Sequence, residues 1–271
     1  MTKDDPAILD LAAAVLASAA PADKTAAARR AFAALQKPWL GGLRPATNIP
    51  DRPARPARPV LVSPGEVPRR RPGSQEGRIA LLHALAHIEF NAIDLAFDMA
   101  VRFAPAVAAD GLDAGAFIAD WVGVGADEAR HFEMLEERLA GLGAAYGDHP
   151  AHDGLWEAAE STRSDLLARL SVAPMALEAR GLDVTPGMIE RLSAAGDAES
   201  AAILRVIYRE EVGHVAAGVR WFEAVCAARG LKPRETFRRL VADHLAGGLK
   251  PPFNVEARAR AGFSSAYYEA G

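Results

Sequence analysis

The chain has 271 residues, of which 50% are hydrophobic and 24% charged, as in an ordinary soluble globular protein. Its formal net charge of −4 argues against nucleic-acid binding by the molecule as a whole. No run approaches the roughly 20 apolar residues of a membrane span. Cys226 is the only cysteine, which excludes a disulfide within the chain. We therefore expect a cytoplasmic protein without a signal peptide.

The N-terminal segment is predicted to form a helical hairpin. Residues 6–19 are rich in alanine and leucine, with Pro6 at the first helical position and Pro21 just beyond the end. Residues 24–35 form the second predicted helix. The short connection between them places the two helices side by side.

Residues 37–73 differ sharply in composition, with nine prolines and seven arginines. Because proline fixes φ and lacks an amide donor, this density excludes a helix and favours an extended, polyproline-like arm. One interpretation is an arm on the protein surface whose arginines pair with acidic helix faces. The other is a phosphate-binding arm for RNA, with Arg52, Arg55 and Arg58 as candidates. No known nucleic-acid-binding module is evident, which favours the first interpretation.

Four long helical patterns follow, over residues 75–103, 113–139, 153–180 and 197–229. The first is expected to end before Pro105, and Pro174 is expected to kink or break the third. Residues 181–187 are expected to depart from regular helix, and 186–194 to form a short extra helix. A tail helix over 233–245 and a last amphipathic segment near the C-terminus complete the prediction.

The predicted fold class is all-α. A four-helix bundle over residues 74–230 would follow the hairpin and arm at residues 1–73, and a C-terminal helical extension at 231–271 would pack on the bundle.

Two Glu-x-x-His pairs lie inside these helical patterns, Glu128 with His131 and Glu211 with His214. Residues three apart lie on the same side of a helix, so the carboxylate and the imidazole of each pair can bind one ion. A single such pair arises often by chance on a solvated helix face. Two pairs on separate helices indicate a metal site.

Two further glutamates complete the pattern, Glu89 on the first long helix and Glu178 on the third. Glu89 projects from an apolar stripe, where an ionised carboxylate needs a partner, a proton or a metal. The apolar surroundings of Glu178 are weaker, and it is the least firmly assigned ligand. The predicted ligands are Glu89, Glu128, His131, Glu178, Glu211 and His214, a set that suits two iron ions or, with the same donor types, manganese or a mixed iron–manganese pair.

This order of Glu, Glu-x-x-His, Glu, Glu-x-x-His resembles the ferritin-like di-iron carboxylate superfamily. Segments around Glu89, His131, Glu178 and His214, the Arg/Pro-rich arm and the run Leu249-Lys-Pro-Pro-Phe-Asn254 resemble domain-of-unknown-function family 455. The resemblance covers nearly the whole chain. It implies a ferritin-like bundle and the ligands named above, and it implies no substrate.

Several polar residues lie near the predicted ligands. Tyr208 precedes Glu211 by one turn and is the candidate catalytic residue, as a hydrogen-bond partner of a ligand or as a redox side chain. His83 and His87 form a line on the first long helix that is separate from the Glu89 stripe. They either orient ligands or bond neighbouring helices, and the second interpretation is favoured.

The leading functional hypothesis is an oxidoreductase, a hydroxylase or oxidase that activates O2 or peroxide at a di-iron site to act on a small molecule. Its substrate and electron donor leave no signature in the sequence. The alternatives are a ferroxidase or iron-handling protein, a tRNA-modifying hydroxylase, and a non-enzymatic helical module with a structural metal. We expect no membrane association, and a monomer or homodimer.

Overall fold

The computed structural model describes residues 7–36, 46, 49–67 and 72–269. Within these residues the ordered structure is helical, apart from one isolated bridge between Leu61 and Ala151. The prediction of an all-α fold is therefore confirmed. The chain divides into two compact units. Unit 1 comprises residues 1–69, 79–109 and 113–153, and unit 2 comprises residues 70–78, 110–112 and 154–271.

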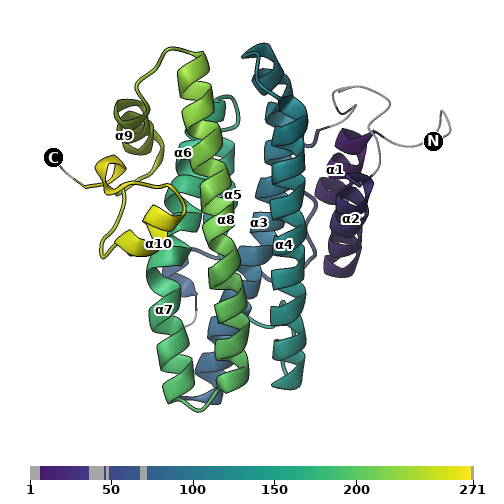
Figure 1. The fold of residues 1–271 in the computed structure, drawn as a ribbon. Helices are drawn as coiled ribbons and strands as arrows, with labels where there is room; N and C mark the ends of the chain where they lie inside the picture. Colours follow the sequence, from purple (N-terminus) through teal and green to yellow (C-terminus); the bar gives the residue numbers. More distant parts are fainter. Residues whose placement is uncertain (1–6, 37–45, 47–48, 68–71, 270–271) are drawn as a thin grey trace. The chain divides into compact units, whose positions relative to one another are not determined.

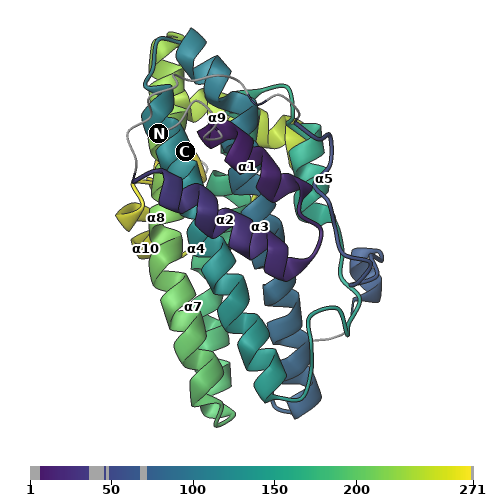
Figure 2. The same cartoon turned by 90° about the vertical axis from the view of Figure 1, so that its right-hand side faces the viewer.

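Unit 1 is built from the N-terminal hairpin and the first two long helices. Its helices are α1 (Ile8–Ala17), α2 (Pro21–Ala34), α3 (Gln75–Ala109) and α4 (Ala114–Gly141). The first residues of α3, up to residue 78, are assigned to unit 2. Figure 2 shows the α1–α2 hairpin lying across α4, which α2 contacts. The predicted hairpin is confirmed, except that Pro21 begins α2 as well as following α1.

The described part of the arm binds the surface of unit 1. Arg52 pairs with Asp153, and Arg55 lies 2.6 Å from Asn91 Oδ1 and 3.3 Å from Asp94 Oδ2 on α3. A short 3-10 turn, Pro64–Glu66, follows. The contact between Arg55 and Asp94 on α3 matches the interpretation in which arginines of the arm pair with acidic helix faces.

Unit 2 contains the remaining helices. They are α5 (Gly154–Ser161), α6 (Leu166–Val172), the π-helical segment η2 (Ala173–Glu178), α7 (Ala179–Ala194), α8 (Ala198–Ala228), α9 (Pro233–His244), α10 (Val255–Arg260) and the 3-10 turn η3 (Ser265–Tyr267). In Figure 1, α7 and α8 run side by side, and α9 and α10 pack on α8. An aromatic cluster of Phe222, Phe237, Phe263 and Tyr267 forms the core beneath the C-terminal helices. The domain boundaries at residues 73 and 230 stay predictions.

Two of the predicted helix boundaries are wrong. The helix α3 does not stop before Pro105 but continues to Ala109, since the last turn is held by buried Val107 while proline removes only one backbone hydrogen bond. The third long helix is not continuous from residue 153. It breaks after Ser161 because Asp165 caps a new helix, its side chain accepting from the amides of Leu167 and Ala168.

The prediction that residues 181–187 leave regular helix is also wrong, because α7 runs through Pro186 without interruption. A proline inside a helix frees the carbonyl four residues earlier, here that of Leu182. Asn254, which precedes α10, donates from Nδ2 to this carbonyl at 3.1 Å. The irregularity falls earlier instead, in the π-helical segment that contains Pro174 as expected.

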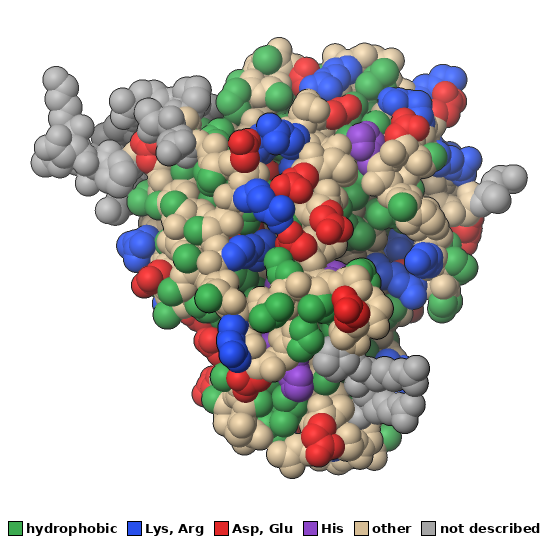
Figure 3. All heavy atoms as spheres, turned by 180° about the vertical axis from the view of Figure 1, so that it is seen from behind, with side chains coloured by type: hydrophobic (Ala, Val, Ile, Leu, Met, Phe, Trp, Pro, Cys, Tyr) green, Lys and Arg blue, Asp and Glu red, His purple; other side chains and the backbone are tan. Residues whose placement is uncertain are grey.

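Charged side chains cover the surface in a mixed pattern. On the face drawn in Figure 3, basic and acidic side chains are interspersed. Within the described ranges, none of the helices has the length and apolar character needed to cross a membrane.

Candidate metal centre

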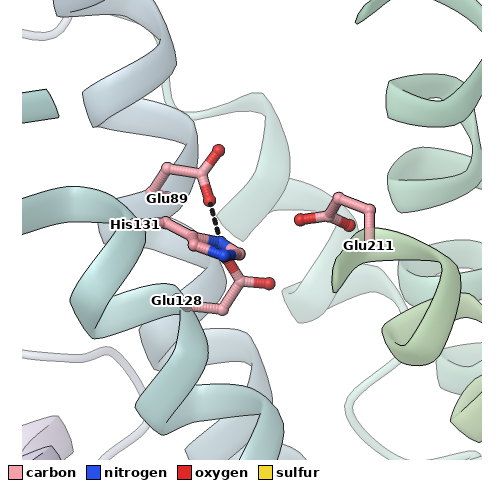
Figure 4. Close-up of side chains that lie close together, drawn as sticks. All are labelled: Glu89, Glu128, His131 and Glu211. Carbon is pink, nitrogen blue, oxygen red and sulfur yellow. Dashed lines mark hydrogen bonds and ion pairs between the residues drawn. The ribbon is translucent and has the colours of Figure 1, made fainter. Parts of the chain in front are cut away.

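Two neighbouring helices of unit 1 bring three potential metal ligands together. Glu89 projects from α3, and Glu128 and His131 project from successive turns of α4. His131 Nδ1 lies 3.3 Å from Glu89 Oε2 and 3.4 Å from Glu128 Oε2 (Figure 4). Glu89, Glu128 and His131 each offer one ligand atom, and these atoms lie within 4.8 Å of one another. The i, i+3 spacing on α4 therefore gives the one-sided pair that the sequence predicts.

All three side chains are buried, with exposed fractions of 5% for Glu89, 1% for Glu128 and 0% for His131. Burial and the charge of Glu128 hold the pKa of Glu89 well above its usual range. Burial alone would lower the pKa of His131, but hydrogen bonds to Glu128 and Glu89 outweigh it and raise this pKa to about 11. Without a metal, the cluster therefore holds protons where a cation would otherwise neutralise the carboxylates.

Two aromatic residues next to the ligands in the sequence contact the loop that follows α4. Phe90 and Phe132, each next to a ligand in the sequence, pack against the ring of Tyr146. His87 Nδ1 lies 2.9 Å from the Tyr146 hydroxyl, and His83 Nε2 accepts from the amide of Gly147 at 2.9 Å. Both histidines thus bond the loop that follows α4, and not a neighbouring helix as expected. Burial, with the nearby Arg55 charge, lowers the pKa of His87 to about 4.

Unit 2 carries the second Glu-x-x-His pair, on α8. His214 Nδ1 lies 3.6 Å from Glu211 Oε1, and the exposed fractions are 2% for His214 and 8% for Glu211. Glu178 ends the π-helical segment and is half-buried. Among the described residues of this unit, Glu178 forms no three-ligand cluster with Glu211 and His214. Figure 4 labels Glu211 as the member of this pair that it draws.

Tyr208, the candidate catalytic residue, lies one turn before Glu211 on α8. Its hydroxyl oxygen lies 3.0 Å from Asn254 Nδ2 and 3.4 Å from Arg260 Nη2, both of which donate to it. Asn254 and Arg260 are not among the residues that the sequence predicts near Tyr208. A signal was present for Asn254, since asparagine before Val255-Glu-Ala-Arg258 is a helix N-cap pattern.

The fold and these residues define a class, namely an all-helical protein with a buried glutamate–histidine cluster of the kind that can bind a metal ion. The chain belongs to the family described as "Protein of unknown function (DUF455)", whose model matches residues 17–269. It is 42% identical over 211 residues to an "Uncharacterized protein" of Haemophilus influenzae, covering 78% of this chain and 73% of that protein. No solved structure matches. The resemblance to family 455 is thus confirmed, and membership of the ferritin-like superfamily stays a prediction.

Proposed function

We propose that the chain is a di-iron carboxylate oxidoreductase, with manganese or a mixed pair as the alternative occupants. The convergence of Glu89, Glu128 and His131 in a buried cluster is the observation that carries this proposal. Two carboxylates and an imidazole are a donor set that iron and manganese share. The buried Glu211–His214 pair repeats the motif and would supply the second half of the centre, with Glu178 as the remaining carboxylate.

The residues fit such a group because their buried charges need a cation or protons. A pair of bound irons would supply two-electron reduction of O2 or peroxide. The chain would contribute ligands held on helices, and their burial would limit the access of water. We propose a hydroxylase or oxidase acting on a small molecule.

The test is anaerobic loading of the metal-free protein with Fe(II), followed by O2, with metal content and absorbance recorded. We expect two irons per chain and a visible or near-ultraviolet band after O2. Glu128→Ala should abolish binding by the cluster, because it removes a carboxylate that contacts His131. Glu137→Ala, an exposed glutamate on the same helix, is the matched control and should bind iron normally.

Two results would contradict the proposal. Less than one iron per chain after reconstitution would show that the chain does not hold a di-iron centre. Zinc bound without any response to O2 would leave a structural metal and no oxidoreductase. Normal iron binding by Glu128→Ala would show that the ligand assignment is wrong.

A further inference from the structure

The hydroxyl of Tyr208 receives hydrogen bonds and has its own proton left to donate. Asn254 Nδ2 and Arg260 Nη2 both donate to its oxygen. A phenol oxygen accepts through its lone pairs and carries one O–H donor. No acceptor for this proton lies within hydrogen-bond distance among the residues that the structure describes.

The orientation of the Asn254 side chain is determined by its other contacts. Its Oδ1 accepts from the amide of Ala257 as the N-cap of α10. Its Nδ2 must therefore serve as the donor, and it reaches both the Leu182 carbonyl and the Tyr208 hydroxyl. Its backbone amide donates to Asp183 Oδ1 at 2.9 Å. Both polar groups of the Asn254 side chain thus have fixed partners. The oxygen and nitrogen of its amide cannot exchange places, so Nδ2 is the group that faces Tyr208.

The segment that carries Asn254 is firmly bound to α7. Arg258 Nε and Nη2 donate to the two carboxylate oxygens of Asp183 at 2.9 and 2.7 Å, and both side chains are buried. The Arg258 guanidinium also lies over the rings of Phe253, Phe263 and Tyr268. A bidentate, buried pair with stacked rings restricts motion more than a surface ion pair does.

We propose that the C-terminal segment 250–260 positions Tyr208, one helical turn before the Glu211–His214 pair on α8, as a hydrogen-bond donor, with Asn254 as the positioning residue. Because Asn254 and Arg260 both donate to the phenol oxygen, the hydroxyl group would act as a donor, and its proton would be given to an oxygen atom of a reactant. This inference rests on the proposed function for the identity of the reaction. The geometry of Tyr208 itself can be tested without a metal.

The first experiment uses metal-free protein labelled with ¹³C at the phenol carbon of tyrosine. The chain has four tyrosines, and Tyr208→Phe assigns the signal of Tyr208 by its loss. In Asn254→Ser, where serine can still cap α10, the Tyr208 signal should move while the other three stay. Because this variant also leaves the Leu182 carbonyl without its donor, it is repeated with Pro186→Ala, which returns a backbone amide to that carbonyl.

The matched control is Arg180→Ala. Arg180 donates to the carbonyls of Lys250 and Pro252 and so binds the same segment to α7 without contacting Tyr208. Its Tyr208 signal should match that of the unmodified protein. An unchanged Tyr208 signal in the double variant Asn254→Ser/Pro186→Ala, with the protein folded, would overturn the positioning role.

The second experiment measures the reaction of Fe(II)-loaded protein with O2. Tyr208→Phe and Asn254→Ser/Pro186→Ala should each slow it by about tenfold at unchanged iron content, and combining them should slow it no further. A wild-type rate in Tyr208→Phe, or additive losses, would overturn the donor role. Failure of the unmodified protein to bind iron would refute the proposed function, while the ¹³C signals would still decide whether Asn254 positions Tyr208.

Discussion

Glu89 and His131 must lose protons before they can both ligate a cation. Their pKa values are raised in the metal-free protein, that of His131 to about 11. The protonated form of His131 therefore persists through neutral pH, and each displaced proton competes with the metal. We expect the apparent affinity for Fe(II) or Mn(II) to rise with pH by about tenfold per unit for each proton released.

A chelator-competition titration at several pH values, with proton release measured in weak buffer, checks this expectation. The Glu137→Ala variant should show the same slope as the unmodified protein. A pH-independent affinity would contradict the assignment of His131 as a ligand.

A second residue-scale prediction concerns the buried ion pair between Lys24 on α2 and Asp94 on α3. Their atoms Nζ and Oδ1 lie 2.5 Å apart, and both side chains are 0% exposed. Replacing Lys24 leaves the buried Asp94 with Arg55 as its remaining cation, 3.3 Å from Oδ2, so Lys24→Met should lower the free energy of unfolding by about 3 kcal/mol, the lower end for a broken buried pair. Arg29, also on α2, forms an exposed pair with Glu133 on α4, so Arg29→Ala should cost less than about 1 kcal/mol. Denaturant unfolding of both variants gives the comparison, and equal losses would contradict it.

At the scale of elements, α8 packs closely on the π-helical segment. A Cβ at Gly218 would lie 2.5 Å from Pro174 Cβ and 2.7 Å from Pro174 Cγ. The proline ring cannot move aside as a flexible side chain can, so Gly218→Ala should destabilise the protein by about 1–3 kcal/mol.

Gly213→Ala on the same helix is the control for this change. A Cβ there meets nothing within 4 Å, and alanine favours helix over glycine by roughly 0.5–1 kcal/mol. Denaturant unfolding of the metal-free proteins should therefore show opposite signs for the two variants. If Gly218→Ala stabilises the protein, α8 and the π-helical segment pack less closely than described.

Elements with strong local signals are predictable from the sequence. Asp113 caps α4 and Asp197 caps α8, and the side chain of each accepts a hydrogen bond from a helix amide. Both helices begin where the sequence pattern predicts. The errors occur where a distant residue decides the outcome. Nothing near Pro186 indicates that Asn254 supplies the donor that lets α7 continue.

The same distinction holds for the candidate site. The pair on α4 and its partner Glu89 follow from helical spacing and apolar stripes, and the structure brings these three together. The position of Tyr208 follows from spacing too, but its partners Asn254 and Arg260 lie about 50 residues away in the sequence. Helical periodicity cannot predict such contacts.

At the scale of the whole molecule, we propose ligands on helices of both units. Metal binding at about 100 times the dissociation constant should raise the unfolding temperature by about 5–10 °C. Hydrogen exchange should slow in α3 and α4 of unit 1 and in α8 of unit 2. Glu128→Ala should lose these effects and Glu137→Ala should retain them. Protection confined to unit 1 would show that Glu211 and His214 are not ligands.

The contact between Asn254 and the Leu182 carbonyl has a consequence for how the sequence can evolve. A chain with proline at position 186 depends on the donor at 254, whereas a chain with an ordinary residue there supplies its own amide. The effects of substitutions at 186 and 254 on stability should therefore be non-additive. A lineage that loses the asparagine is viable more readily after it has lost the proline, so the order of the two changes would matter.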